Sequence, residues 1–121
     1  MLEEINLAFL SLNRTISIDI TTLTRLRFLN LSNNDIEGNI FEKGWEKLTK
    51  LEIIELQYNV LTGSIPNSMR FLPELIYLNF SFNKMQGPIK ILTSSQKLQG
   101  LDFSNNEFTT FPWGYFEEHT F

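Results

Sequence analysis

Apolar residues recur along this chain in one fixed pattern, L-x-x-L-x-L-x-x-N, with Ile or Phe at some of the Leu positions. The four copies end in Asn34, Asn59, Asn83 and Asn106, at steps of 25, 24 and 23 residues. Side chains of a strand alternate between its two faces, so Leu29 and Leu31 point inward while the residues between them point outward. The pattern predicts four short strands, each followed by a turn at its Asn.

Each Asn lies where the chain leaves its strand, and its amide can both donate and accept hydrogen bonds. We expect it to pair with backbone groups that the turn would otherwise leave buried and unpaired. Asn34, Asn59, Asn83 and Asn106 would then stack as a structural ladder. Further apolar residues follow each Asn and should close each coil against the next: Ile36, Leu61, Met85 and Phe108, then Ile40, Ile65, Ile89 and Phe111.

This pattern is identified as a leucine-rich repeat, because it matches the repeat consensus position by position in four copies. The resemblance implies an α/β-type solenoid in the form of a short right-handed arc. A parallel β-sheet should line its concave face, and the convex side should be irregular or built of 3-10 and short helical segments. The concave face of such a solenoid is the usual binding surface.

The register extends backwards once, because Ile5 and Leu7 lie 24 residues before Leu29 and Leu31. The position of the Asn, however, holds Leu10. Terminal repeats are commonly atypical, so we expect a degenerate first coil. The chain is then one leucine-rich repeat domain over residues 1–121, divided into the degenerate first coil 1–22, four clear repeats 23–112 and a C-terminal tail 113–121.

Composition limits the function more than it defines it. The formal charge of −4 and pI near 4.9 disfavour a nucleic-acid partner. No apolar run is long enough for a membrane segment, and the first residues do not resemble a signal peptide. Disulfides are rare in the cytosol, so the absence of Cys leaves a cytoplasmic location as an alternative.

Catalytic and metal chemistry find little support in the sequence. The single histidine, His119, lies near the C-terminus beside Glu117 and Glu118, and the chain has no thiol. A solvated terminal cluster explains these three residues better than a metal site does. We therefore expect no catalytic residues, no cofactor and no metal, and no enzymatic activity.

The second half of each repeat carries a further resemblance. Asn59-Val-Leu61-Thr-Gly63-Ser-Ile65-Pro66 matches N-x-L-x-G-x-I-P, the signature of the plant-specific repeat subclass. The chain thus resembles a fragment or truncated copy of the ectodomain of plant receptor-like proteins and receptor kinases. That resemblance implies a place on the extracellular side of the plasma membrane or in the apoplast. This chain lacks the paired cysteines that usually cap such ectodomains.

Three sequons are candidate glycosylation sites: Asn13, Asn30 and Asn79. The alternation of the strands places Asn30 and Asn79 at exposed positions of the concave face. The common Leu-Asn-Leu-Ser form of the repeat also creates a sequon without any glycan. The sequons therefore add only slight weight to secretion.

The outward positions of the middle strands gather aromatic and acidic residues. We expect the ligand-binding surface on the concave face to comprise Phe28, Ile53, Glu55, Tyr58, Tyr77, Phe82 and Asp102. Exposed aromatic side chains beside hydrogen-bonding groups suit a protein or peptide interface. The alternative interpretation is that these aromatics only cover neighbouring strands or lie partly buried at the rim.

We expect a non-catalytic protein- or peptide-binding module that perceives a ligand or contacts a co-receptor in defence or development signalling. Two alternatives are binding of a pathogen hydrolase, as in polygalacturonase-inhibiting proteins, and a cytosolic structural or scaffold role. An open solenoid end also predicts a homodimer. A C-terminal tail folded back over the last coil is the alternative, and it carries Trp113, Tyr115, Phe116 and Phe121.

Overall fold

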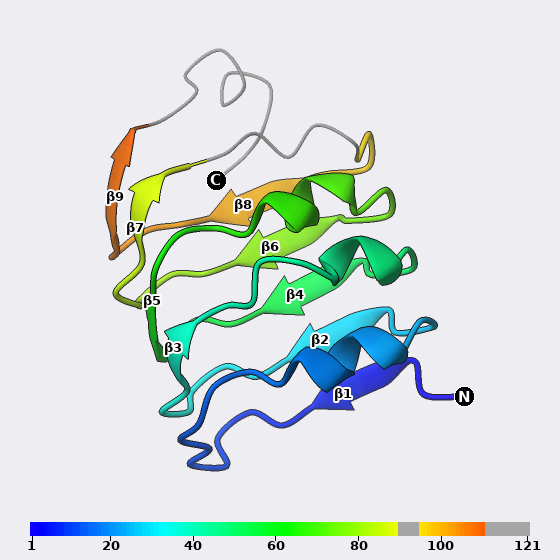
Figure 1. Cartoon of the computed structure of the whole chain (residues 1–121), viewed down its shortest axis with the longest axis horizontal. Helices are drawn as coiled ribbons and strands as arrows, with labels where there is room; N and C mark the ends of the chain where they lie inside the picture. Colours follow the sequence, from blue (N-terminus) through cyan, green and yellow to red (C-terminus); the bar gives the residue numbers. More distant parts are fainter. Residues whose placement is uncertain (90–94, 111–121) are drawn as a thin grey trace.

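Five three-residue strands form one parallel sheet, in the order β1-β2-β4-β6-β8 (Figure 1). The structure is a computed structural model that describes residues 1–89 and 95–110. Equivalent positions of successive repeats lie in register, so that Leu29 aligns with Ile54 and Ile54 with Leu78. The leucine-rich repeat solenoid is therefore confirmed. The strands are β1 (Glu4–Asn6), β2 (Phe28–Asn30), β4 (Ile53–Glu55), β6 (Tyr77–Asn79) and β8 (Gly100–Asp102).

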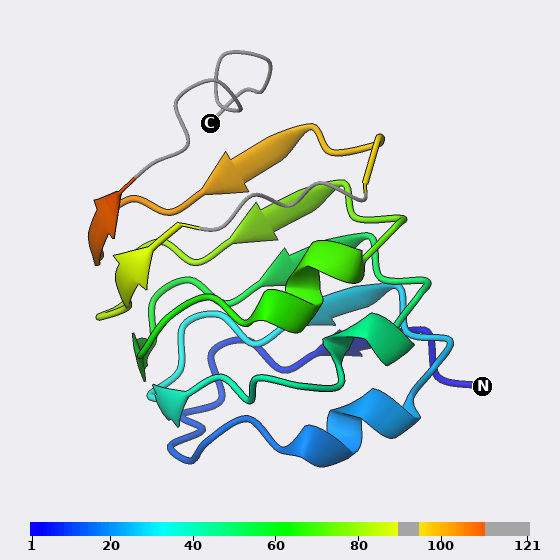
Figure 2. The same cartoon turned by 45° about the horizontal axis from the view of Figure 1, so that its top comes forward.

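Short 3-10 helices cover the side of the solenoid opposite the sheet, as the turned view in Figure 2 shows. They are η1 (Ile18–Thr22), η2 (Trp45–Lys47) and η3 (Asn67–Phe71). Each helix returns the chain from the end of one strand to the start of the next. The described residues contain no α-helix, which agrees with the expected irregular or 3-10 convex side.

Two small parallel sheets extend the coils beyond the ends of the main strands, at the left of Figure 1. They pair β3 (Glu37–Asn39) with β5 (Val60–Thr62), and β7 (Gln86–Pro88) with β9 (Glu107–Thr110). Gly63 ends the turn after β5 with a φ of +79°, and a Cβ there would lie 2.6 Å from Asn39 Oδ1. The positive φ therefore favours glycine at this position of N-x-L-x-G-x-I-P, which also lies close to the Asn39 side chain of the preceding coil.

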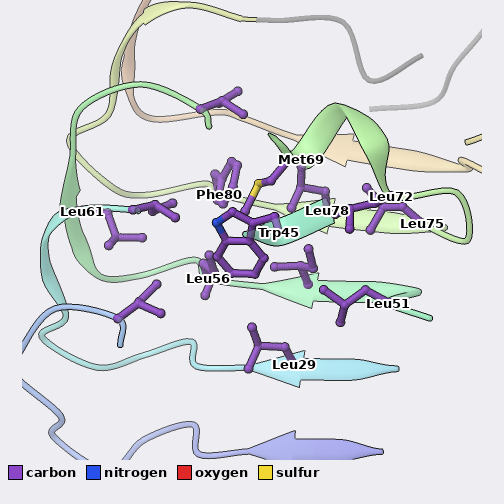
Figure 3. Close-up of a cluster of buried hydrophobic side chains, with 14 of the residues drawn as sticks. Leu29, Trp45, Leu51, Leu56, Leu61, Met69, Leu72, Leu75, Leu78 and Phe80 are labelled. Atoms are coloured by element: carbon purple, nitrogen blue, oxygen red, sulfur yellow. The ribbon is translucent and has the colours of Figure 1, made fainter. Parts of the chain in front are cut away.

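Inward-facing side chains from the strands and the convex side fill a single core. Trp45 of η2 lies at its centre, fully buried, with Met69 of η3 on one side and Leu56 on the other (Figure 3). Its ring stacks on Phe41 at a centroid distance of 4.7 Å, and its Nε1 donates to the carbonyl of Phe41 at 3.1 Å. Trp45 is not a position of the repeat consensus, and the sequence analysis did not assign it to the core.

Each repeat Asn joins its own coil to the coil before it. Asn59 Nδ2 donates to the carbonyl of Leu31 in the preceding coil at 2.9 Å and to that of Leu56 in its own coil at 3.2 Å. Its Oδ1 accepts from the N–H of Ile36, again in the preceding coil, at 3.0 Å. These groups lie in the interior, where an unpaired backbone group is costly. Asn83 and Asn106 make the equivalent bonds.

The first coil depends on Asn34 of the second. Asn34 Oδ1 accepts from the N–H groups of both Leu10 and Leu12, and its Nδ2 donates to the carbonyl of Leu7. Leu10, in the Asn position of the first coil, supplies no such amide. The bonds from Asn34 take its place, and they explain how a degenerate coil can still turn and pair β1 with β2.

The proposed boundaries 1–22, 23–112 and 113–121 stay a prediction. Three predictions fall on residues that the structure does not describe. They concern Phe111, the tail 113–121 with its aromatic side chains, and the cluster of His119, Glu117 and Glu118.

We predict that Asn59→Ala lowers the free energy of unfolding by about 1–3 kcal/mol, because buried backbone partners lose their hydrogen bonds. Asn33→Gly is the matched control. It removes an amide from the neighbouring position, where φ is +56° and glycine is tolerated without strain. Urea unfolding followed by circular dichroism measures both variants. Equal losses for the two would contradict the role given to Asn59.

Candidate binding face

Three apolar side chains form the floor of a groove on the concave face. Phe28, Ile53 and Tyr77 lie directly opposite one another on β2, β4 and β6, and each is half-buried. Together with the neighbouring strand residues they line an open groove of about 390 Å³. The lining residues are Glu4, Ile5, Asn6, Phe28, Leu29, Asn30, Ile53, Glu55 and Tyr77.

The next outward position lies two residues further along each strand, and these positions in register form a second column across the sheet. Short polar side chains in this column hold the backbone where it leaves the sheet. Asn30 Oδ1 accepts from the backbone N–H of Ser32 at 3.0 Å and from its Oγ at 2.7 Å. Asp102 Oδ1 accepts from Ser104 in the same way, at 3.0 and 2.7 Å. Asn and Asp suit such turns because their oxygen reaches the backbone two residues on. Glu55 occupies the same column without this role.

Tyr77 lies between the acidic positions of this face. Its hydroxyl oxygen accepts from Asn79 Nδ2 at 3.2 Å. Burial raises the pKa of the Tyr77 phenol, and the nearby negative charge of Asp102 and, more weakly, of Glu55 raises it further. The hydrogen bond from Asn79 acts in the opposite direction. The ring is thus held in a half-buried, electronegative part of the face.

Two further aromatic residues form a stack at the rim. Tyr58 and Phe82 lie at a centroid distance of 4.4 Å with an interplanar angle of 9°, and their exposed fractions are 49% and 42%. Both immediately precede a ladder Asn and have φ values of +57° and +55°. The same position in the other coils holds Phe9, Asn33 and Asn105, also at positive φ. Asn tolerates this conformation far better than a bulky ring does.

The two rim aromatics therefore occupy a position that disfavours them. A non-glycine residue in the left-handed region costs on the order of 1–3 kcal/mol. Stacking of the two rings returns about 0.5–1.5 kcal/mol. Stacking thus offsets only part of the cost of this backbone conformation.

The structure divides the predicted surface into two parts. Phe28, Ile53, Glu55 and Tyr77 line the groove, while Tyr58 and Phe82 form the separate rim stack. Asp102 is not a lining residue of the groove, but it lies on β8 beside β6, opposite Asn79. Glu4, Asn6 and Asn30 also line the groove and were not predicted to belong to the binding surface, although they occupy equivalent outward positions of their strands.

The expectation that Asn79 is exposed was wrong. Its exposed fraction is 8%, because its amide is packed against the Tyr77 hydroxyl and its Oδ1 accepts from the N–H of Ser81. Attachment of a glycan to this Nδ2 would require the side chain to leave both contacts. Asn30 is half-buried and Asn13 is exposed, and their glycosylation stays a prediction. Ser32 and Ser81, two residues after Asn30 and Asn79, are also buried.

Among residues 1–89 and 95–110 there is no group of three His, Cys, Asp or Glu side chains that could hold a metal ion. No helix in the same part of the chain is long and apolar enough to cross a membrane.

We predict that Tyr77 titrates above the ordinary tyrosine pKa of about 10. A raised pKa means that the folded state holds this proton more tightly than the unfolded state does. The resulting stability is fully present below the pKa of the unfolded chain and is lost as pH rises through the folded pKa.

Phenolate absorbance of the wild type minus that of Tyr77→Phe measures the shift. The double variant Glu55→Gln/Asp102→Asn should reduce the shift without abolishing it, because burial is its largest cause. Titration of Tyr77 at or below the ordinary value would contradict this environment.

The sequence model of the Leucine Rich Repeat family matches residues 25–44, 50–72 and 97–118, which together make up more than half of the chain. Among curated proteins of Arabidopsis thaliana, Receptor-like protein 31 is 37% identical over 87 residues, which cover 70% of this chain and 10% of that protein. Receptor like protein 23 is 34% identical over 113 residues, covering 91% and 12%. The chain thus spans about a tenth of the length of these relatives.

Solved structures agree with this relationship. The plant peptide hormone receptor RGFR1 in complex with RGF2 superposes with a TM-score of 0.84 at 31% identity, over 88% of this chain and 17% of the receptor chain. The Arabidopsis receptor kinase HAESA, in complex with the peptide hormone IDA and the co-receptor SERK1, gives a TM-score of 0.84 at 28% identity, over 88% and 18%. The chain therefore belongs to the leucine-rich repeat family, and it is related to the ectodomains of plant receptor-like proteins and receptor kinases.

Proposed function

We propose that this array is a non-catalytic protein- or peptide-binding module of a plant receptor-like ectodomain, and that it binds its ligand on the concave face. The observation that carries this proposal is the pair of exposed, stacked rings of Tyr58 and Phe82 in a backbone conformation that disfavours them. Large aromatic side chains supply much of the binding energy at protein interfaces. A binding role for the two rings would account for a backbone conformation that costs folding free energy.

The groove supplies the second half of the surface. Phe28, Ile53 and Tyr77 offer apolar contact, and the acidic and amide groups around them offer hydrogen bonds. Its floor is a sheet face rather than a closed cavity, which suits an extended segment of a protein better than a small molecule. Two of the related structures are receptors in complex with peptide hormones, and one of these also contains a co-receptor. A ligand of the same kind, and a co-receptor, are the partners we propose here.

The same relationship supports a place on the extracellular side of the plasma membrane or in the apoplast. There the module would contribute to ligand perception in defence or development.

The test is a pull-down from a plant extract with the tagged chain and the variant Tyr58→Asn/Phe82→Asn. Asn fits this position because Asn33 and Asn105 already occupy it at positive φ. We therefore expect the variant to melt no lower than the wild type while losing at least about tenfold in affinity for the captured partner.

Phe71→Ser is the matched control, since Phe71 is also an exposed ring, at 58%, but lies on η3 of the convex side. Unchanged capture by the rim variant would overturn the proposed site. Capture of a secreted hydrolase would favour the inhibitor-like alternative, and capture of cytosolic proteins alone would favour the scaffold.

We also propose that these 121 residues, when studied by themselves, pair with a second copy through the first coil. β1 is an edge strand of the sheet, and exposed apolar side chains gather around it and along the rest of this end. Open edges and apolar patches both favour association, and a two-fold pair closes without forming a fibre. These side chains are Leu2, Leu7, Phe9, Leu10, Leu12 and Ile18.

Light scattering at micromolar concentration should show a dimer for the wild type and a monomer for Leu10→Glu. Phe71→Glu, which places the same charge on the convex side, should stay dimeric. A wild type that is monomeric throughout this range would contradict the pairing.

A further inference from the structure

We propose that the concave face selects a ligand segment that carries an arginine side chain next to an apolar one. The guanidinium would lie between Glu55 and Asp102 against the Tyr77 ring, and the apolar side chain would rest on Phe28 and Ile53. This inference rests on the proposed function and adds the chemistry of the ligand.

The charge of the sheet has one sign. Its five strands contain Glu4, Glu55 and Asp102, and they contain no Lys or Arg. The basic residue just before β2, Arg27, is already paired through its Nε with Glu52. A ligand with positive charge is therefore attracted to this face, and one with negative charge is repelled.

Two carboxylates of this face flank one aromatic ring. Glu55 on β4 and Asp102 on β8 stand in register with Asn79 of the intervening strand β6. Two strand spacings separate their backbones, which is about 10 Å. The Tyr77 hydroxyl is bonded to the Asn79 side chain at 3.2 Å, so the phenol is held between the two acidic positions.

Neither carboxylate is fully used within the fold. Glu55 makes no side-chain hydrogen bond or ion pair in the described part of the chain. Asp102 has Oδ1 bound to Ser104, and within residues 1–89 and 95–110 its second oxygen makes no hydrogen bond. Both side chains are half-buried, so an opposite charge placed here is screened less than at an open surface.

Arginine fits this arrangement better than other cations do. A metal ion needs several oxygens at about 2.3–2.6 Å, which two carboxylates on strands this far apart do not supply. The guanidinium is planar and carries donors on more than one edge, so it can bind carboxylates on both sides while stacking on an aromatic ring.

The apolar part of the groove continues from Tyr77 across the strands. Ile53 and then Phe28 follow it on β4 and β2, about 5 and 10 Å away by strand spacing. A residue two or three positions from the arginine in an extended ligand covers this distance, at about 3.3 Å per residue. The ligand is thus expected to run across the strands, along the solenoid.

The test variant is Glu55→Gln/Asp102→Asn. Asparagine keeps the turn at position 102, because Asn30 holds Ser32 with the same two hydrogen bonds that Asp102 makes to Ser104. The control variant is Glu37→Gln/Glu107→Gln, which removes the same charge from exposed residues of β3 and β9, outside the concave sheet.

The experiment starts from random peptides displayed on phage and selected on the immobilised wild-type chain. The selected peptides are then synthesised with arginine or with citrulline, which keeps the shape and removes the charge. Fluorescence anisotropy gives their affinities for the wild type and both variants.

We expect selection to enrich arginine near an apolar residue, and citrulline to weaken binding to the wild type about tenfold, as one or two partly exposed ion pairs would. The test variant should bind the arginine and citrulline forms equally. The control variant should keep the difference.

Two results would overturn the inference and leave the proposed function standing. One is selection of peptides without basic residues that lose affinity in Tyr58→Asn/Phe82→Asn or Tyr77→Leu. The other is an arginine preference that Glu55→Gln/Asp102→Asn leaves intact, because the guanidinium then binds elsewhere. Failure to retain any peptide or any protein from the plant extract would overturn both the inference and the proposed function.

Discussion

The hydrogen bonds of the repeat Asn side chains are the interaction on which the rest of this structure depends. A coil must leave its strand and turn sharply, and the backbone N–H and C=O groups that this places in the interior need hydrogen-bond partners there. One side-chain amide meets this need in two coils at once, as Asn59 does for Leu31, Ile36 and Leu56. These bonds therefore join each coil to its neighbour where the chain leaves the sheet, beside the backbone pairing of the strands themselves.

The same constraint determines what the rim can present. The residue before each ladder Asn has the left-handed conformation. Phe9 has it too, at the equivalent position of the first coil, where Leu10 replaces the Asn. Where the chain carries Asn33 or Asn105 it accepts this conformation at low cost. Where it carries Tyr58 and Phe82, the two rings stack on each other beside the sheet. A structural requirement of the turn thus becomes the means by which aromatic groups are displayed.

Much of this fold could be predicted from the sequence, because strand alternation and the repeated Asn are local signals that recur in phase. Leu29 and Ile54 are buried and paired as their positions in the repeat require. What could not be predicted depends on contacts between coils. The β3–β5 pair joins segments of two successive coils, and Trp45 reaches the core from outside the consensus. The outward positions of the groove residues could likewise be predicted from strand alternation. The burial of Asn79 beside Tyr77 could not, because it depends on the conformations that these two side chains adopt together.

The direction of the ladder has a consequence for how such a chain is made. Each Asn completes the turn of the coil that precedes it, as Asn34 does for Leu10 and Leu12 and Asn83 for Leu61. During synthesis, a coil that has left the ribosome still lacks the amide that closes its backbone, until the following coil emerges. The newest complete coil is therefore always one behind the chain that has been translated, and the growing solenoid carries a single unfinished turn toward the ribosome.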